Sequence, residues 1–521
     1  MKTYGCFDRE YWNYSSTDVS CARKQEAVLT LALVHGLDVP QNPFFDNAGV
    51  VSYIDAALGY WCHIQLSDGS FNDLYPYERS FVATAFSAYA VSEALLQLRN
   101  TGTAARLRNA DLAVASLRRA GNWITRKVQT PVCNQICGSI AFLQNLYLLT
   151  GDAHYLSDIA EKLQTLQHLQ TSEGWMPEYG GFDVGYTSVA VDYLGKYYER
   201  SGDPCVLAIA GKLCDFLAEF VHPDASFGGE YGSRSTQYML PHGFAVFAPQ
   251  IPSASWLNHA VQRSLAAGQD VIPFSVDDKY LLFNGYTFLQ AHLTTARAIK
   301  QPATYARPSQ RARYFEGCKI YVHENDAFSL VVNGAKGGAL HLYLKPQQKT
   351  VIDSGVLAET VNRRRFVTLG LDPRNRVTVS QDAAITCILI EGSMRKPFDN
   401  QLTLLRNLAL RGFQATFGRW PALSHLIKES LRRALITRRG SSPHRFRRTI
   451  KVDATSVEIS DELHIAASLR SLVTLAPLDS IYGESSRYFA KPQLETEMIV
   501  LNAPKPQQDG VYRVHQRFEA Q

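Results

Sequence analysis

The sequence predicts an α+β protein: an N-terminal α/α toroid of helical hairpins followed by a C-terminal antiparallel β-sandwich that carries a basic helical insertion. Apolar residues recur at helical spacing through the first 305 residues. Similar loops recur there about every 52 residues, the length of a helical hairpin with a long loop. After Cys318 the apolar residues alternate with a period of two, which is typical of strands.

The toroid prediction covers residues 1–305. Helical periodicity appears at 25–35, 80–98, 110–128, 136–149, 155–169, 189–200, 206–220 and 281–299. The sequence around Gly151 resembles that around Gly202, 51 residues later, and the loop at 65–71 resembles those at 170–175 and 222–227. A single hairpin cannot bury its own apolar face, so several must stack. Closing five or six into a ring gives a toroid, and an open solenoid is the alternative.

The β-sandwich prediction covers residues 318–521, after a linker at 306–317 that is rich in Arg, Pro and Gln. Short runs of β-branched residues, such as "KIYVHEN", "AFSLVVN" and "AITCILIEG", are separated by turn residues. Many such strands without helices between them favour a sandwich.

A basic segment at 395–448 interrupts the strands. It holds 13 Lys and Arg against 2 acidic residues, and Leu, Phe and Trp alternate with its arginines. The pattern predicts two amphipathic helices, divided near 418–421. Because the whole chain carries +5, this insertion carries +11 and the remainder −6.

The overall composition excludes several classes of protein. With 53 basic and 48 acidic residues, the chain is not a dedicated nucleic-acid binder. The nine cysteines have no CxxC spacing, so we expect reduced thiols and no metal site or other cofactor. No apolar run approaches the roughly 20 residues of a membrane span, and the charged N-terminus does not resemble a signal peptide. We therefore expect a cytoplasmic protein.

The inner helices of the predicted toroid begin near Arg79, Asn134, Tyr186 and Tyr238, at spacings of 55, 52 and 52 residues. In such a ring these N-termini gather at one rim, where backbone N–H groups and the helix dipoles favour anions. Polar residues at equivalent positions of successive repeats should therefore face one cavity.

The loops before these helices are rich in aromatic and polar residues. Aromatic rings cover the apolar faces of sugars while polar groups bond the hydroxyls, and an Arg side chain matches a carboxylate or sulfate. The pattern favours a carbohydrate site, and mutual packing of the loops is the alternative. The candidate substrate-binding residues are Glu78, Arg79, Gln135, Trp175, Glu178, Asp183, Glu230, Tyr231 and Arg234.

Four motifs resemble the heparinase II/III-like polysaccharide lyases and their relatives, the alginate lyases and dermatan-sulfate epimerase. "CNQICGSIAF" places Asn134 where the family has an Asn at the start of an inner helix, and "FDVGYTSVAVDY" places Tyr186 at the family's catalytic Tyr. In the β domain, "GAKGGALHLYL" and "VIDSGV" resemble the family's "HxHADALSFxL" strand and "VDPG" turn. Here Lys336 stands in place of a His and Gly338 in place of an Asp. Because these two departures remove metal ligands of the family, we expect no metal in this β domain.

The resemblance implies β-elimination at a uronate of an acidic polysaccharide. Asn134, Gln135 and Arg234 would neutralise the uronate carboxylate and stabilise the enediolate. Tyr186, with its pKa lowered by nearby cations, would remove the C5 proton. Further acid or base candidates are His242, Tyr238 and Lys336.

Other functions on the same fold are open at this stage. Return of the proton to the opposite face would make the protein a C5-epimerase. A glycoside hydrolase would need two carboxylates across the site, and Asp68, Glu78, Glu178, Asp183 and Glu230 are available. A catalytically decayed glycan-binding protein is the remaining alternative.

The two most unusual segments predict further contacts. The N-terminal stretch, which includes Trp12, Arg23 and Glu26, is expected to cap the toroid and reach its site. The insertion 395–448 suits the anionic inner face of a membrane, where the protein could meet a lipid-linked glycan. An acidic partner, the polyanionic substrate, or a solvated helical hairpin are the alternatives.

Overall fold

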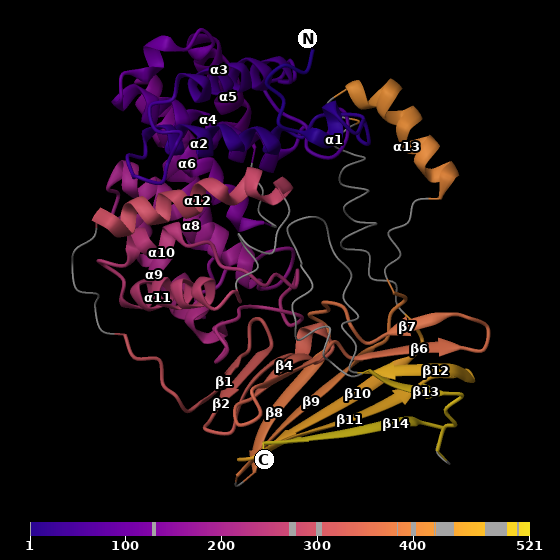
Figure 1. The fold of residues 1–521 in the computed structure, drawn as a ribbon. Helices are drawn as coiled ribbons and strands as arrows, with labels where there is room; N and C mark the ends of the chain where they lie inside the picture. Colours follow the sequence, from indigo (N-terminus) through magenta and orange to yellow (C-terminus); the bar gives the residue numbers. More distant parts are fainter. Residues whose placement is uncertain are drawn as a thin grey trace.

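A computed structural model describes residues 2–127, 132–269, 278–297, 305–382, 384–397, 403–420, 423, 442–474, 498–507 and 510–520 of the chain. In these residues a helical part precedes a part made of antiparallel sheets, and the two parts pack against each other (Figure 1). This order confirms the predicted fold class.

The helical part is a closed double ring. Inner helices α2, α4, α6, α8, α10 and α12 pack in that order, and α12 packs against α2. Their bounds are α2 (Ala27–Gly36), α4 (Phe81–Asn100), α6 (Cys133–Thr150), α8 (Val184–Ser201), α10 (His242–Phe247) and α12 (Asp278–Arg297). The outer helices are α3 (Ala48–His63), α5 (Ala110–Thr125), α7 (His154–Leu169), α9 (Cys205–Leu217) and α11 (Pro252–Ala266). Closure of the ring makes the helical part a toroid and excludes the open solenoid.

The repeat seen in the sequence has a structural cause. Gly151 and Gly202 end α6 and α8 in the left-handed conformation, with φ of 71° and 66°. Glycine adopts this conformation without a Cβ clash, which ends a helix and turns the chain into the next one. Helix α4 is long and apolar enough to cross a membrane, but 83% of its apolar window is buried within the toroid, as expected of a core helix.

The described strands form antiparallel sheets with the orders β1-β2-β3-β4-β5, β14-β11-β10-β9-β8 and β13-β12-β6-β7. Strand β1 lies inside the segment 306–317 that was expected to be a linker. The bounds are β1 (Arg311–Phe315), β2 (Ile320–Glu324), β3 (Phe328–Asn333), β4 (Ala339–Leu344), β5 (Lys349–Asp353), β6 (Val356–Thr360), β7 (Arg365–Val367), β8 (Arg376–Asp382), β9 (Ile385–Ser393), β10 (Arg445–Val452), β11 (Ser456–His464), β12 (Leu469–Thr474), β13 (Ile499–Asn502) and β14 (Tyr512–Glu519).

The insertion leaves the sheets after β9 and reaches the toroid. Its helix α13 (Leu404–Thr416) and the 3-10 turn η5 (Phe417–Arg419) lie beside the short helix α1 (Arg9–Trp12) of the N-terminal stretch (Figure 1). Arg411 forms an ion pair with Asp18 at 3.0 Å. Most of the second predicted helix falls in 424–441, outside the described residues.

Candidate active site

Asn134 lies in the first turn of α6 and is held by Glu178 from the preceding loop of the next repeat. The Asn134 backbone N–H and side-chain Nδ2 donate to the two oxygens of Glu178, at 2.8 and 2.7 Å. The first N–H groups of a helix have no partner within it, so Glu178 serves as the missing acceptor. Burial raises the pKa of the Glu178 carboxyl well above its usual range, and the two bonds from Asn134 lower it in part.

Asp183 fixes the start of α8, where Tyr186 lies. Its side chain is fully buried and accepts the Tyr186 backbone N–H at 3.2 Å, as an N-cap does. It also accepts the Arg234 N–H at 2.9 Å and the Thr236 hydroxyl. One carboxylate therefore ties the first turn of α8 to the loop that carries Arg234.

Tyr186 is half-buried and lies among aromatic and cationic side chains. The Tyr179 ring centroid is 5.7 Å from that of Tyr186, and the Arg234 guanidinium stacks on Tyr179 at 4.5 Å. Tyr238 packs against the start of α8, since a Cβ on Gly185 would come within 2.9 Å of its ring. Burial raises the pKa of Tyr238 well above its usual range, so this phenol stays protonated and can donate a proton but not remove one. We call Asn134, Tyr179, Tyr186, Arg234 and Tyr238 the Tyr186 cluster.

The N-terminal stretch brings a further cation toward this cluster. Arg23 donates to Glu26 at 2.8 Å, and its charge acts to lower the pKa of Tyr238. Glu26 accepts from Tyr286 of α12 at 3.4 Å. The stretch thus reaches the ring interior through Arg23 and Glu26, whereas Trp12 lies in α1 and is 46% exposed.

The β domain holds the Arg234 loop from the other side. Lys336 is buried, and its Nζ donates to Gly232 O at 2.8 Å and to Ser235 Oγ at 2.7 Å. Asn333 donates to Tyr231 O at 2.6 Å. Lys336 therefore acts on the cluster by positioning a loop; its ammonium group is engaged by that loop.

Arg79 and Glu78 organise the first loop and its contact with the insertion. Glu78 accepts the backbone N–H groups of Asp73 and Leu74 at 3.1 and 2.7 Å. Arg79 pairs with Asp68 at 3.0 Å and donates to the carbonyls of Gly418 and Arg419, at 3.2 and 2.7 Å. Arg79 therefore docks η5 of the basic insertion onto the toroid.

Several predicted residues lie outside the cluster. His242 is fully buried and lies 3.5 Å from Glu199, which is 13 residues, or about 20 Å, along α8 from Tyr186. Tyr231 is fully buried and its hydroxyl lies 3.0 Å from His222. Trp175 is buried and donates to Glu173 at 2.9 Å, and Glu230 is also buried. Gln135, next to Asn134, is half-buried.

Sequence reasoning missed Tyr179 and left Arg23 without a role at the site. Tyr179 lies in the left-handed region, with φ of 56°, which turns its ring toward Tyr186. The loop "EGWMPEYGGFDVGYTS" before α8 contains this residue, and the Tyr-Gly-Gly turn before Asp183 was the available signal.

A buried arginine packs against Gly338 of the β domain. A Cβ on Gly338 would lie 2.6 Å from Cδ of Arg448, so this arginine side chain fills the space beside the glycine. Arg448 is fully buried and bonds both oxygens of Asp461 at 2.7 Å. It also pairs with Asp353, of the "VIDSGV" motif, at 3.1 Å. An ion triad occupies this part of the β domain.

The fold is similar to that of solved polysaccharide lyases. The Streptomyces coelicolor A3 chondroitin AC lyase in complex with chondroitin sulphate superposes with a TM-score of 0.55 at 10% identity, over 87% of this chain and 63% of that one. A point mutant of that lyase gives 0.50 at 10% identity, over 87% and 63%. A Paenibacillus xanthan lyase gives 0.48 at 10% identity, over 89% and 44%.

No family model matches the sequence, and no curated protein matches it. The chain spans less than two thirds of the length of these three lyases. The resemblance expected from the motifs is confirmed at the level of the fold, which is similar to that of a solved polysaccharide lyase.

Proposed function

We propose that this protein is a polysaccharide lyase that acts on an acidic, uronate-containing polysaccharide. One observation carries the proposal: Asn134 and Tyr186 occupy the first turns of adjacent inner helices in a toroid of the lyase fold. Two buried carboxylates, Glu178 and Asp183, fix those turns. A chondroitin AC lyase of the same fold has been solved with chondroitin sulphate, which supports an acidic glycan as the substrate class.

The chemistry assigned to the cluster is removal of the C5 proton followed by β-elimination. Asn134 and Arg234 neutralise the uronate carboxylate, which makes the C5 proton easier to remove. Tyr186 is the proposed base, because it is the half-buried phenol of the cluster on the first turn of α8. Tyr238 stays protonated and is the proposed donor to the departing 4-oxygen.

The contacts of the acidic residues support a lyase over a hydrolase. A hydrolase needs one carboxyl to protonate the leaving group and a second to activate water or attack the sugar. Glu178 and Asp183 instead anchor helix starts, and Glu78 anchors a loop. Asp68 holds Arg79, and Glu230 is buried.

Incubation with a panel of uronate polymers tests the proposal. A lyase produces unsaturated uronates, detected by their ultraviolet absorbance, in step with new reducing ends. Exchange of C5 hydrogen for solvent deuterium without that absorbance would indicate an epimerase. Reducing ends without unsaturation would indicate a hydrolase, and binding with none of these changes would indicate a decayed lyase.

A further inference from the structure

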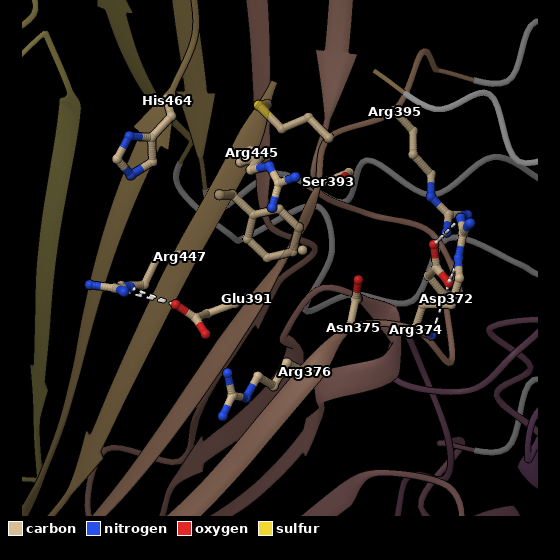
Figure 2. A pocket seen from close by; sticks show the side chains of 13 residues that line it. Asp372, Arg374, Asn375, Arg376, Glu391, Ser393, Arg395, Arg445, Arg447 and His464 are labelled. Atoms are coloured by element: carbon tan, nitrogen blue, oxygen red, sulfur yellow. Dashed lines mark hydrogen bonds and ion pairs between the residues drawn. The ribbon is translucent and has the colours of Figure 1, made fainter. Parts of the chain in front are cut away.

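A cavity of about 450 Å³ lies on the sheet β14-β11-β10-β9-β8 and is strongly basic (Figure 2). Within the described residues its lining includes arginines from β8, β10 and the flanking segments, together with His464, against Asp372 and Glu391. We call it the arginine pocket and define it by Arg374, Arg376, Arg395, Arg445 and Arg447.

The register of the strands explains where positive charge is compensated on this sheet. One row of facing residues runs across four neighbouring strands: Arg376 on β8, Glu391 on β9, Arg447 on β10 and Glu462 on β11. This row alternates in sign, and Arg447 pairs with Glu391 at 2.8 Å. Opposite charges at facing positions stabilise a sheet, so Glu391, Arg447 and Glu462 balance one another, whereas Arg376 lies at the end of the row.

The next row lacks a carboxylate. Arg445 lies between Ser393 on β9 and His464 on β11. Arg376 faces Glu391, whose carboxylate is bonded to Arg447. Across the part of the chain that the structure describes, neither Arg376 nor Arg445 has a side-chain ion pair or hydrogen bond. Both side chains are exposed, so the pocket contains two guanidinium groups that can bind an anion.

A third part of the pocket is held rigidly. Asp372 pairs with Arg374 at 2.9 Å and also with Arg395. Partial burial raises the pKa of the Asp372 carboxyl, but the bonds and charges of the two arginines lower it by more, so it stays ionised. One carboxylate thus fixes two cations at the wall of the pocket (Figure 2).

The pocket adjoins the loop that contacts the Tyr186 cluster. Leu371, next to Asp372, contacts Gly181, where a Cβ would lie 3.0 Å from its side chain. Gly181 belongs to the turn that carries Tyr179. The Leu371 carbonyl also accepts from Arg395 at 3.2 Å. A glycan held in the pocket would therefore lie next to the segment that borders the candidate active site.

We propose that the arginine pocket binds the sulfate or carboxylate groups of an acidic oligosaccharide, as a second glycan-binding site in the β domain. The choice of a saccharide rests on the proposed function, whereas the preference for a sulfate or carboxylate rests on the arginines, whose planar forks match these groups.

Arg376→Gln combined with Arg445→Gln removes the two pocket cations that have no ion pair among the described residues. The matched control is Lys451→Gln combined with Arg517→Gln, which removes the same charge from exposed positions of β10 and β14. Lys451 lies six residues from Arg445 along β10, about 20 Å away on the same face. All variants carry Tyr186→Phe so that turnover does not interfere, and their thermal unfolding is compared to exclude misfolding.

The measurements are the Kd for a size-defined chondroitin sulfate oligosaccharide and for its desulfated counterpart, and protection of arginines from a dicarbonyl reagent. We expect the pocket variant to bind at least about tenfold more weakly than the control variant. We also expect the oligosaccharide to protect Arg376 and Arg445 but not Arg517. Weaker binding of the desulfated chain would assign the pocket to sulfate, and equal binding would assign it to carboxylate.

Equal affinities of the pocket and control variants, or absence of protection at Arg376 and Arg445, would overturn the proposal. Its failure is distinguishable from failure of the proposed function. Pocket binding without cleavage of any uronate polymer would retain the pocket and reject the lyase. Cleavage of a uronate polymer by the wild type, together with equal affinities of the pocket and control variants, would retain the lyase and reject the pocket.

Discussion

Arg448 shows at the scale of single residues how an altered motif is stabilised. A glycine at 338 leaves the space that the arginine fills, and Asp353 and Asp461 neutralise it from two strands. The carboxylates raise the pKa of Arg448 beyond the cost of its burial, so the guanidinium stays charged. An ion triad of one arginine and two aspartates therefore occupies the space beside Gly338.

Replacing Arg448 with Met should destabilise the protein strongly. The variant leaves two carboxylates buried without their cation, and such a loss costs about 3–5 kcal/mol of unfolding free energy. Lys451→Met on the same strand is the control; it lies 3.9 Å from Glu458 and is 55% exposed, so its loss should cost less than about 1 kcal/mol. Urea unfolding measures both. Similar midpoints for the two variants would contradict the assigned role of the triad.

The sequence predicts some site residues better than others, for physical reasons. Asn134 and Tyr186 follow from repeat spacing, because helix starts recur with the hairpin. Aromatic residues in the loops do not reveal whether they face solvent or the core, and Trp175 and Tyr231 prove to be buried. Arg448 could not be predicted beside Gly338, since 110 residues separate them and only the sheet brings them together.

At the scale of elements, the loop that carries Arg234 is held from two domains. Asp183 binds it from the toroid, and Lys336 binds it from the β domain. This explains how Lys336 contributes to the site although its ammonium group is occupied.

Lys336→Met should loosen this loop. Removing the donor leaves Gly232 O and Ser235 Oγ without a partner, which should cost about 1–3 kcal/mol of stability. The rate at which this variant cleaves a uronate polymer should also fall, because Arg234 loses its fixed position. Lys345→Met, at the opposite end of β4 and 25% exposed, is the control. Unchanged turnover in Lys336→Met would contradict the positioning role.

The insertion is a second element with a specific expectation. Its described helix α13 exposes Leu404, Leu405 and Leu408, by 76%, 79% and 58%. A basic segment with exposed leucines is complementary to an anionic membrane surface. Membrane binding by the segment 395–448 remains a prediction.

Leu404→Ser combined with Leu405→Ser should reduce sedimentation of the protein with anionic liposomes several-fold. Each substitution removes exposed apolar area that would enter the lipid. Val361→Ser, at an equally exposed position of the β domain, is the control. Undiminished sedimentation of the leucine variant would reject this role for α13.

Helix prediction succeeded where periodicity was strong and missed elements where it was not. The predicted segments at 80–98 and 155–169 match α4 and α7 closely. Helix α3 was missed because its sequence is apolar almost throughout, and α10 because it has six residues. Helix α10 is an inner helix whose six residues are all buried, so the packing of the ring determines it more than its own periodicity does.

At the scale of the whole molecule, the two domains share a buried polar junction. His222 of the toroid stacks on His341 of β4 with ring centroids 3.8 Å apart. Near it, Arg311 binds Glu219 of the toroid and Glu324 of β2. Because these contacts join distant parts of the sequence, no local pattern could predict them.

The histidine pair predicts that acid weakens the protein. Burial lowers the pKa of His341 from 6.5 to about 4, and burial together with His341 and nearby arginines lowers the pKa of His222 well below its usual value. Between pH 6.5 and about pH 4, His341 is protonated in the unfolded chain but not in the folded protein. The free energy of unfolding therefore decreases as pH falls from about 6.5 to about 4, by up to about 3 kcal/mol for His341.

Urea unfolding at pH 7.5 and pH 4.5 measures this effect. His341→Gln should reduce the pH dependence, whereas His515→Gln, at a position 55% exposed, should not. An identical pH dependence in wild type and His341→Gln would contradict the assignment.

The central claim is that Tyr186 removes a proton from an acidic glycan, and Tyr186→Phe tests it most directly. The control is Tyr198→Phe, which removes a hydroxyl from the same helix three turns away. On a uronate polymer that the wild type cleaves, we expect Tyr186→Phe to lower the rate of unsaturated-product formation, followed by ultraviolet absorbance, by at least about 100-fold. Glycan binding should be unchanged, and Tyr198→Phe should retain activity. Equal rates for wild type and Tyr186→Phe would contradict it.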